Sequence, residues 1–457
     1  MIRRLTPLAA ILLTGCMATT PPPQSTPSTG VAARFMASEQ TPIADIPADW
    51  WRLYDDPELD ALVRASLAAN TDLRVAYANL DGARAALRGA RAAQLPQTNI
   101  ESGLTVDGTR TQPSANAVPS TDWDIGATAS WEIDLFGRLR SGALAARADM
   151  EAQEAAKDGV RVAVVADTVL AYVDYCGTTR AIAVAREVAA AHAHQLSLVQ
   201  AQLDAGEVSP LEVSQAASLA AGSRAAVPTL EAQRDNALYR LATLQGRAPV
   251  EGKDLGLTCD VVPQVNSSVT IADGMALLQR RPDIREAERK LAAAAARVGV
   301  ARADLYPRIN LGGALGLLTG AFDVALTPLI SWSFPNQAPA RTRIAQASAT
   351  EQAALANWDG LVLKALRELS TALSLYEAEA RRNHDLAEAA SEAQAYARRA
   401  AARVRLGDAP GLLQIDAERS LATARLQQAQ SALLLGQAQV ALFRSMGGGW
   451  QSGTEPR

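Results

Sequence analysis

The apolar residues of this chain follow two different periods, and each change of period marks a new element. Over 57–95 they recur every three or four positions, which is the period of an amphipathic helix, and Pro96 ends that helix. Over 124–133 apolar and polar residues alternate strictly, as on a β-strand whose two faces differ. A weaker alternation over 100–106 precedes a polar loop at 108–122. The pattern predicts one helix followed by a pair of strands.

A very long helical pattern follows the strands. It runs without a break from 138 to 204, which corresponds to about 100 Å at 1.5 Å per residue. A glycine and a proline within 206–210 predict a tight turn, after which a second helix runs back toward 247. Alanines dominate the packing positions, which permits close helix packing but would equally suit a plain coiled-coil rod. We therefore expect a helical hairpin.

The same order of elements occurs twice. Residues 71–100 match residues 282–311 at a constant offset of 211 positions, and both copies share an Asp-x-Arg and an Arg…Pro-x-x-Asn pattern. The predicted strands and hairpins of the two copies are at 97–134 and 138–247, and at 307–334 and 338–447. We expect two homologous halves at 50–250 and 271–448, an equatorial linker at 251–270, and a C-terminal tail at 449–457.

The predicted strands have the character of membrane strands. One face of 124–133 is apolar and the other is polar, which is typical of a transmembrane β-strand. Four strands leave two open edges that a bilayer does not tolerate, so other copies of the chain would have to close the sheet. A soluble two-layered sandwich is the alternative. The aromatic residues near the strand ends are candidates for the membrane interface: Trp123, Trp131, Tyr306 and Trp332.

The N-terminus predicts export and lipidation. Arg3 and Arg4 precede a short apolar run at 8–13, which is typical of a secretion signal. Small residues directly before Cys16 resemble a bacterial lipobox, so we expect a signal peptide at 1–15 and lipid on Cys16. A plain signal peptide with a chance cysteine is the alternative. The Pro-, Ser- and Thr-rich stretch within 16–49 would be a flexible tether.

Composition and charge narrow the function further. Aromatic residues make up only 4% of the 457 residues and Ala and Leu are abundant, so we expect a mainly helical protein. The net charge of −4 gives no reason to expect a nucleic-acid partner. His192, His194 and His384 have no metal-site spacing and are interpreted as helix-surface residues. No nucleophile–base pair or phosphate loop occurs, so we expect no enzyme and no cofactor. Export would allow a disulfide between Cys176 and Cys259; two separate thiols are the alternative.

Four motifs in a fixed order carry a resemblance to a family. They are WWRLYDDPEL at 50–59, WEIDLFGR at 131–138, RRPDIR at 280–285 and LYPRI at 305–309. The chain resembles the TolC-like outer-membrane efflux proteins, specifically their lipoprotein branch of the OprM/NodT type. The resemblance implies a homotrimer with a twelve-strand β-barrel continued by a twelve-helix α-barrel. One departure is 333–338, where the family has a Phe-Asp-Gly-Gly-Arg-like turn.

The resemblance also implies a gate at the helix tips. The stretch 407–419 matches the family's tip turn and places Asp416 where the family has a pore-facing carboxylate, while Arg419 would bridge to a neighbouring chain. An ordinary solvated Asp–Arg pair is the alternative. The residues expected to contact an adaptor protein are Gly206, Glu207, Gly407 and Asp408.

The function implied by the resemblance is that of a passive export duct. It would be lipid-anchored in the outer membrane, with its helical tunnel in the periplasm, and would serve a periplasmic adaptor and an inner-membrane transporter of the RND type. Its cargo would be small molecules. The alternatives are the outer-membrane component of a type I protein secretion system and a lipid-anchored coiled-coil scaffold without a pore.

Overall fold

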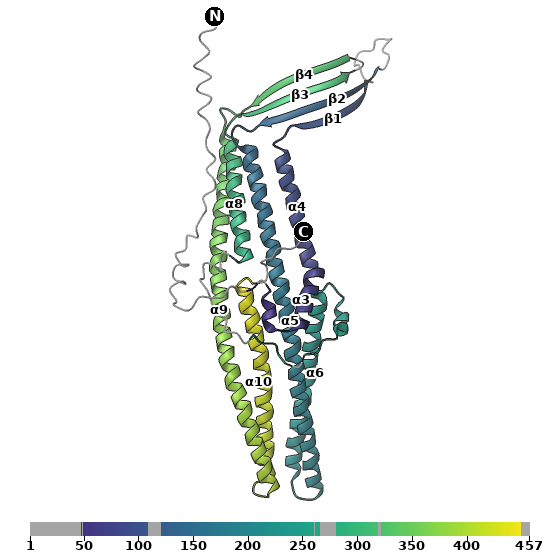
Figure 1. Cartoon of the computed structure of the whole chain (residues 1–457), viewed down its shortest axis with the longest axis vertical. Coiled ribbons are helices and arrows are strands. Elements are labelled where there is room, and N and C mark those ends of the chain that lie inside the picture. Colours follow the sequence, from purple (N-terminus) through teal and green to yellow (C-terminus); the bar gives the residue numbers. More distant parts are fainter. Residues whose placement is uncertain are drawn as a thin grey trace. The chain divides into compact units, whose positions relative to one another are not determined.

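The computed structural model describes residues 47, 49–107, 120–259, 261–265, 280–318 and 321–448 (Figure 1). The predicted signal peptide, the lipidation site Cys16, most of the tether and the C-terminal tail lie outside this part of the chain. The described chain is mainly helical with a small sheet. Its helices are η1 (Trp50–Tyr54), α3 (Pro57–Ala69), α4 (Thr71–Ala92), α5 (Arg138–Asp204), α6 (Pro210–Leu244), η2 (Pro249–Leu255), α8 (Pro282–Ala303), α9 (Ala338–Arg405) and α10 (Gly411–Ser445).

The helix predicted over 57–95 is in fact two helices, so this prediction was wrong. Asn70 lies between α3 and α4 with an extended backbone, and its Oδ1 accepts hydrogen bonds from the amides of Asp72 (2.9 Å) and Leu73 (3.1 Å). Its Nδ2 donates to the carbonyl of Leu244 at 3.0 Å. An Asn that caps new helical amides starts a helix of its own. The apolar period continues in phase across the break, which is why the sequence pattern hides it.

The chain divides into two compact units that do not follow the sequence repeat. The first, which we call the sheet unit, contains 78–155 and 283–361, and the second, the hairpin unit, contains the described residues of 47–77, 156–282 and 362–448. Each unit therefore combines segments of both halves. The repeat is a unit of sequence, whereas each compact unit is built by pairing equivalent elements of the two copies.

The sheet unit contains one antiparallel sheet of order β1-β2-β3-β4 (Figure 1). Its strands are β1 (Gln97–Asp107), β2 (Ser120–Ile133), β3 (Arg308–Leu318) and β4 (Ala321–Ser331). The central pair β2–β3 joins the two halves, with Trp131 opposite Leu311 and Ile133 opposite Ile309. Within the described chain β1 and β4 are the edge strands.

The hairpin unit has one large apolar core. Trp50 of η1 stacks on Phe443 of α10 with ring centroids 4.7 Å apart, and Val169 and Tyr172 of α5 and Leu241 of α6 are almost completely buried around them. Toward the hairpin turns the packing changes to alanine, as at the buried Ala417 of α10, which lies against Ala397 and Ala400 of α9. Small side chains let these helices pack closely along their length.

Candidate functional site: a two-faced sheet, two hairpin turns and a cross-linked linker

The sheet has two chemically different faces. Cross-strand partners share a face, so the register of the three strand pairs assigns every strand position to one side. On the apolar face lie Ile100, Ile125, Ala127, Ala129, Trp131, Ile133, Ile309, Leu311, Gly313, Pro328 and Ile330, with Thr98 and Ser102 as polar exceptions. On the polar face lie Asn99, Glu101, Thr128, Ser130, Glu132, Asn310, Gly312 and Ser331, with Leu329 as an apolar exception.

The apolar face is exposed in the chain. Ile100 is 80% exposed, Ile330 67% and Ile125 47%, although a soluble antiparallel sheet normally buries its apolar face in a core. A second sheet that could cover this face, as in the sandwich alternative, is absent from the described part of the chain. An exposed apolar face opposite a polar one is the arrangement of a sheet between lipid and water. Among the helices of the described residues, none is long and apolar enough to cross a membrane.

Aromatic side chains mark the strand ends next to the helices, and two of them make equivalent contacts. The indole Nε1 of Trp131 donates to the carbonyl of Gln94, and that of Trp332 donates to the carbonyl of Leu305, both at 3.0 Å. Gln94 and Leu305 are related by the offset of 211 found in the sequence. The side chain of Trp123 lies outside the described part.

Two further aromatic residues complete this group, and sequence reasoning missed both. Phe136 stacks on Tyr306 and Phe334 stacks on Trp332, each with ring centroids 4.6 Å apart. Their signal in the sequence is an aromatic residue three positions after the last strand of each half. The second half reaches α9 through a cis Phe334–Pro335 peptide, whereas the first half turns at Gly137 with a φ of 76°. The chain therefore leaves its two strand pairs by different turns, as the departure at 333–338 suggested.

Ion pairs lie where the strands meet the helices. Arg138 binds both carboxylate oxygens of Glu132 (2.8 and 2.5 Å), and Asp304 accepts from Arg308 (2.5 Å) and Arg343 (3.1 Å). The hydrogen bond from Arg138 to Glu132 raises the pKa of the Arg138 guanidinium. Glu132 and Arg308 belong to the polar face, so the charge at this junction lies on the side away from the apolar face.

The two hairpin turns have the same backbone geometry. Gly206 and Gly407 adopt positive φ angles of 78° and 73°, which a glycine accepts without strain. The following amides, of Glu207 and Asp408, donate back across five residues to the ends of α5 and α9 (2.9 and 3.0 Å). All four of these predicted tip residues are exposed. An ion pair that sequence reasoning missed, Arg403 to Asp408 at 3.0 Å, closes the second turn.

Asp416 and Arg419 both lie exposed on the first turns of α10. The fully buried Ala417 between them fixes the orientation of the helix, because it packs against Ala397 and Ala400 of α9. Within the described residues the structure has no ion pair between Asp416 and Arg419. Both side chains are directed away from the packed face of their helix.

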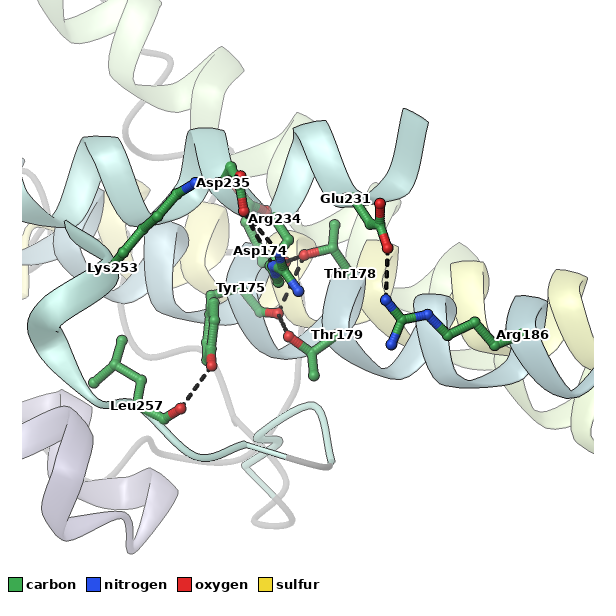
Figure 2. A network of polar contacts seen from close by, with 10 residues as sticks. All are labelled: Asp174, Tyr175, Thr178, Thr179, Arg186, Glu231, Arg234, Asp235, Lys253 and Leu257. Atoms are coloured by element: carbon green, nitrogen blue, oxygen red, sulfur yellow. Dashed lines mark hydrogen bonds and ion pairs between the residues drawn. The ribbon is translucent and has the colours of Figure 1, made fainter. Parts of the chain in front are cut away.

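The middle of the hairpin unit is cross-linked. Cys176 of α5 and Cys259, which follows η2, form a disulfide with an S–S distance of 2.09 Å and Cα atoms 5.1 Å apart. Next to it, the hydroxyl of Tyr175 donates to the carbonyl of Leu257 at 2.7 Å (Figure 2). Asp174 accepts from Arg240 of α6, also at 2.7 Å. The linker is thus held on the same stretch of α5 that binds α6.

The acidic residues of the N-terminal motif take part in the same region, which the sequence alone did not indicate. The Tyr172 hydroxyl donates to Asp56 (2.8 Å) and Glu58 (3.1 Å), and the second oxygen of Glu58 accepts from the amide of Thr258 (3.3 Å). Burial, together with the hydrogen bond to Asp56, raises the pKa of the Tyr172 hydroxyl well above its ordinary range. Tyr172 therefore stays a neutral donor between two carboxylates.

The interpretation of His192 as a surface residue was wrong. His192 is only 4% exposed, and its Nδ1 has no hydrogen-bond partner in the described chain, whereas His194 and His384 are exposed. It lies one helical turn after the buried Val188, on the packed face of α5. Burial lowers its pKa, and the carboxylate of Glu418 on α10 partly offsets that effect. In the described residues no cluster of His, Cys, Asp and Glu could hold a metal ion.

Comparison with known proteins gives one consistent result. The family model described as outer membrane efflux protein matches the chain twice, over 62–247 and 275–448, which correspond to the two halves. The pyoverdine export outer membrane protein OpmQ of Pseudomonas aeruginosa is 29% identical, with 99% of this chain and 98% of OpmQ covered. The toluene efflux pump outer membrane protein TtgC of Pseudomonas putida is 30% identical, with 98% and 95% covered.

A solved structure extends the likeness to three dimensions. The outer-membrane channel OprN matches with a TM-score of 0.83 and 34% identity, over 95% of this chain and 99% of that one. The chain therefore belongs to the outer membrane efflux protein family and is an outer-membrane component of an efflux system.

Proposed function

We propose that the chain is one protomer of a homotrimeric duct whose sheets close into a single twelve-strand barrel. The observation that carries this proposal is the exposed, two-faced sheet with open edges at β1 and β4. Three successive antiparallel pairings make β1 and β4 antiparallel to each other, so β4 of one copy can pair with β1 of the next without changing the pattern. The apolar face would contact lipid and the polar face would line a water-filled lumen.

The long hairpins α5–α6 and α9–α10 would form a twelve-helix tunnel in the periplasm. Their turns carry the exposed predicted tip residues and large apolar side chains that are also exposed: Leu211 (67%), Leu406 (83%) and Leu412 (52%). Exposed leucines beside Glu207 and Asp408 suit a partner that offers both apolar and polar groups. We infer that Gly206, Glu207, Gly407 and Asp408 are the contacts for a periplasmic adaptor protein.

Asp416 and Arg419 would be the gate of the tunnel. Because neither pairs with the other inside the described chain, both are available to neighbouring copies. Three carboxylates brought to one axis would repel one another and attract cations, while Arg419 would bridge to the adjacent protomer. Each protomer would thus contribute one acidic and one basic group to a closed ring.

The anchor, partners and cargo complete the proposal. Lipid on Cys16 and the tether behind it would fix the N-terminus to the outer membrane. The adaptor would connect the tips to an inner-membrane transporter of the RND type, which supplies the energy, while this chain conducts passively and catalyses no reaction. The names of OpmQ and TtgC refer to the export of pyoverdine and toluene, and we infer that this chain also exports small molecules.

Conductance across planar bilayers tests the gate and the pore together. We expect the inserted wild-type protein to be nearly silent and the Asp416→Ala/Arg419→Ala double variant to open. The matched control is Asp81→Ala/Arg84→Ala, because Asp81 and Arg84 form an exposed Asp–Arg pair with the same spacing on α4. The control should stay silent. A silent gate variant in a properly inserted trimer would overturn the gate, and a monomeric mass by light scattering would overturn the trimer.

A further inference from the structure

The two cysteines of the disulfide differ sharply in accessibility. Cys176 is completely buried in the main core, together with Val173 and Tyr172 of the same helix, α5. Cys259 is only partly buried and lies at the edge of that core, in the linker after η2. A reagent that approaches the folded chain therefore meets the sulfur of Cys259 before that of Cys176.

The linker also has contacts of its own that bring Cys259 to its partner. On one side of Cys259, Leu257 accepts from Tyr175 (2.7 Å) and Thr258 donates to Glu58 (3.3 Å). On the other side, the amide and carbonyl of Val265 both bond to the side chain of Gln439, each at 3.2 Å. None of these hydrogen bonds involves a sulfur atom, so the linker can dock while both cysteines are still thiols. Figure 2 shows the bond between Tyr175 and Leu257.

We propose that Cys176 and Cys259 are a modification site for a periplasmic thiol oxidase, with Cys259 the thiol that first attacks the oxidase disulfide and Cys176 the resolving thiol. The partner is a protein that carries a reactive disulfide of its own. This inference rests on the proposed periplasmic position of the helices, since disulfides form in that compartment.

The chemistry balances in two exchange steps. The Cys259 thiolate attacks one sulfur of the oxidase disulfide, forms a mixed disulfide and releases the other oxidase sulfur as a thiolate. The Cys176 thiolate then attacks the Cys259 sulfur and displaces the oxidase as a dithiol. Two electrons leave with the oxidase, and the two protons lost by Cys176 and Cys259 end on its reduced thiols. The buried position of Cys176 confines it to the second step.

The order of attack protects the chain from wrong pairing. The bond joins residues 83 positions apart, on either side of α6 in the sequence. If Cys176 formed a disulfide with another molecule instead, the linker would be left without its cross-link. If Cys16 carries lipid on its sulfur, as proposed, that sulfur is a thioether and cannot compete. The two remaining cysteines of the chain then have only each other as permanent partners.

Single-cysteine variants of the full-length protein test the order directly. Cys176→Ser and Cys259→Ser would be purified in detergent, exposed to oxidised glutathione as a small disulfide probe, and followed by intact mass. We expect the Cys259 thiol of the first variant to take up glutathione at least about tenfold faster than the Cys176 thiol of the second, because exchange depends on access. Equal rates, or faster modification of Cys176, would overturn the proposal.

A second measurement uses the wild-type protein and therefore remains informative if one of the variants fails to fold. Reduced wild-type protein would be alkylated with a limiting amount of maleimide and digested, and we expect the label on Cys259 before Cys176; the reverse order would contradict the proposal. Finally, periplasm that contains the Cys176→Ser variant and the intact oxidase would be quenched with acid and alkylated; we expect the mixed disulfide between Cys259 and the oxidase, because no Cys176 thiol is present to displace it, and absence of this adduct would exclude the oxidase. Bilayer conductance of the same preparations reports on the duct separately, so failure of the duct and failure of the cysteine order are distinguishable.

Discussion

The indole Nε1 of Trp131 lies 3.0 Å from the carbonyl oxygen of Gln94 and donates a hydrogen bond to it. Through this bond the end of β2 holds the turn that leads from α4 into β1. Trp332 does the same for the turn before β3. The internal duplication is therefore preserved as a contact, and each half fastens its strand pair to its own entering helix.

Replacing either indole by phenyl should remove this bond and little else. Trp131→Phe and Trp332→Phe should each destabilise the protein by about 1 kcal/mol, the usual net value of one neutral hydrogen bond. Melting temperature in detergent measures the effect. Tyr306→Phe is the control. It changes a residue of the same aromatic group, but the hydroxyl it removes has no hydrogen-bond partner in the described chain. Equal losses in all three variants would contradict this role of the indoles.

The break at Asn70 is a second test of local structure. Asn70→Ala removes both the cap of α4 and the bond to the Leu244 carbonyl, and should cost about 2 kcal/mol. Asn70→Ser keeps a capping oxygen but cannot reach Leu244, so it should cost about half as much. Circular dichroism during thermal unfolding provides the comparison. If the serine variant were as unstable as the alanine variant, the cap would contribute nothing.

The period of the apolar residues was sufficient to predict the strands and the long helices, and the repeat followed from matching residues at the offset of 211. Strand alternation at 124–133 and helical spacing from 138 onward are local properties, and the fold preserves them. Asn70 and His192 were misjudged because their roles depend on tertiary neighbours. Leu244 is distant in sequence from Asn70, and α10 is distant in sequence from His192, although both neighbours are close in space. A local pattern does not reveal which distant element covers a given helix face.

In the candidate site, too, the sequence indicated what is local, whereas the structure was needed for what depends on distant partners. Chemical type and position near a predicted strand end singled out Trp131 and Trp332, and the structure adds the carbonyls they bind. For Cys176 and Cys259 the sequence allowed both a bond and two thiols, and only the docking of the linker on α5 decides between them. Phe136, Phe334 and Arg403 were missed because each acts through a partner brought close by a turn.

Burial of His192 should make stability depend on pH. Its folded-state pKa lies below the ordinary value of 6.5, so the unfolded chain binds the proton more readily. This contribution to stability is present above pH 6.5 and is lost as the pH falls toward the lowered folded pKa. Melting temperatures between pH 8 and 5 should therefore decline less for His192→Gln than for the wild type. His194→Gln, which changes an exposed ring two residues away, should follow the wild type, and a parallel decline of all three would refute the assignment.

Neighbouring residues of β2 offer the sharpest test of the two faces of the sheet. Ala127 lies on the apolar face and Thr128 on the polar face, so the same substitution would reach lipid at one position and the lumen at the other. Ala127→Arg should destabilise the inserted protein by about 2–4 kcal/mol, because a charge near the bilayer midplane loses its hydration. Thr128→Arg should insert normally and instead shift the conductance of the gate-opened channel toward anions. Outer-membrane levels and bilayer recordings would measure the two effects. If both arginines were equally tolerated for insertion, neither face of this sheet would be in contact with lipid.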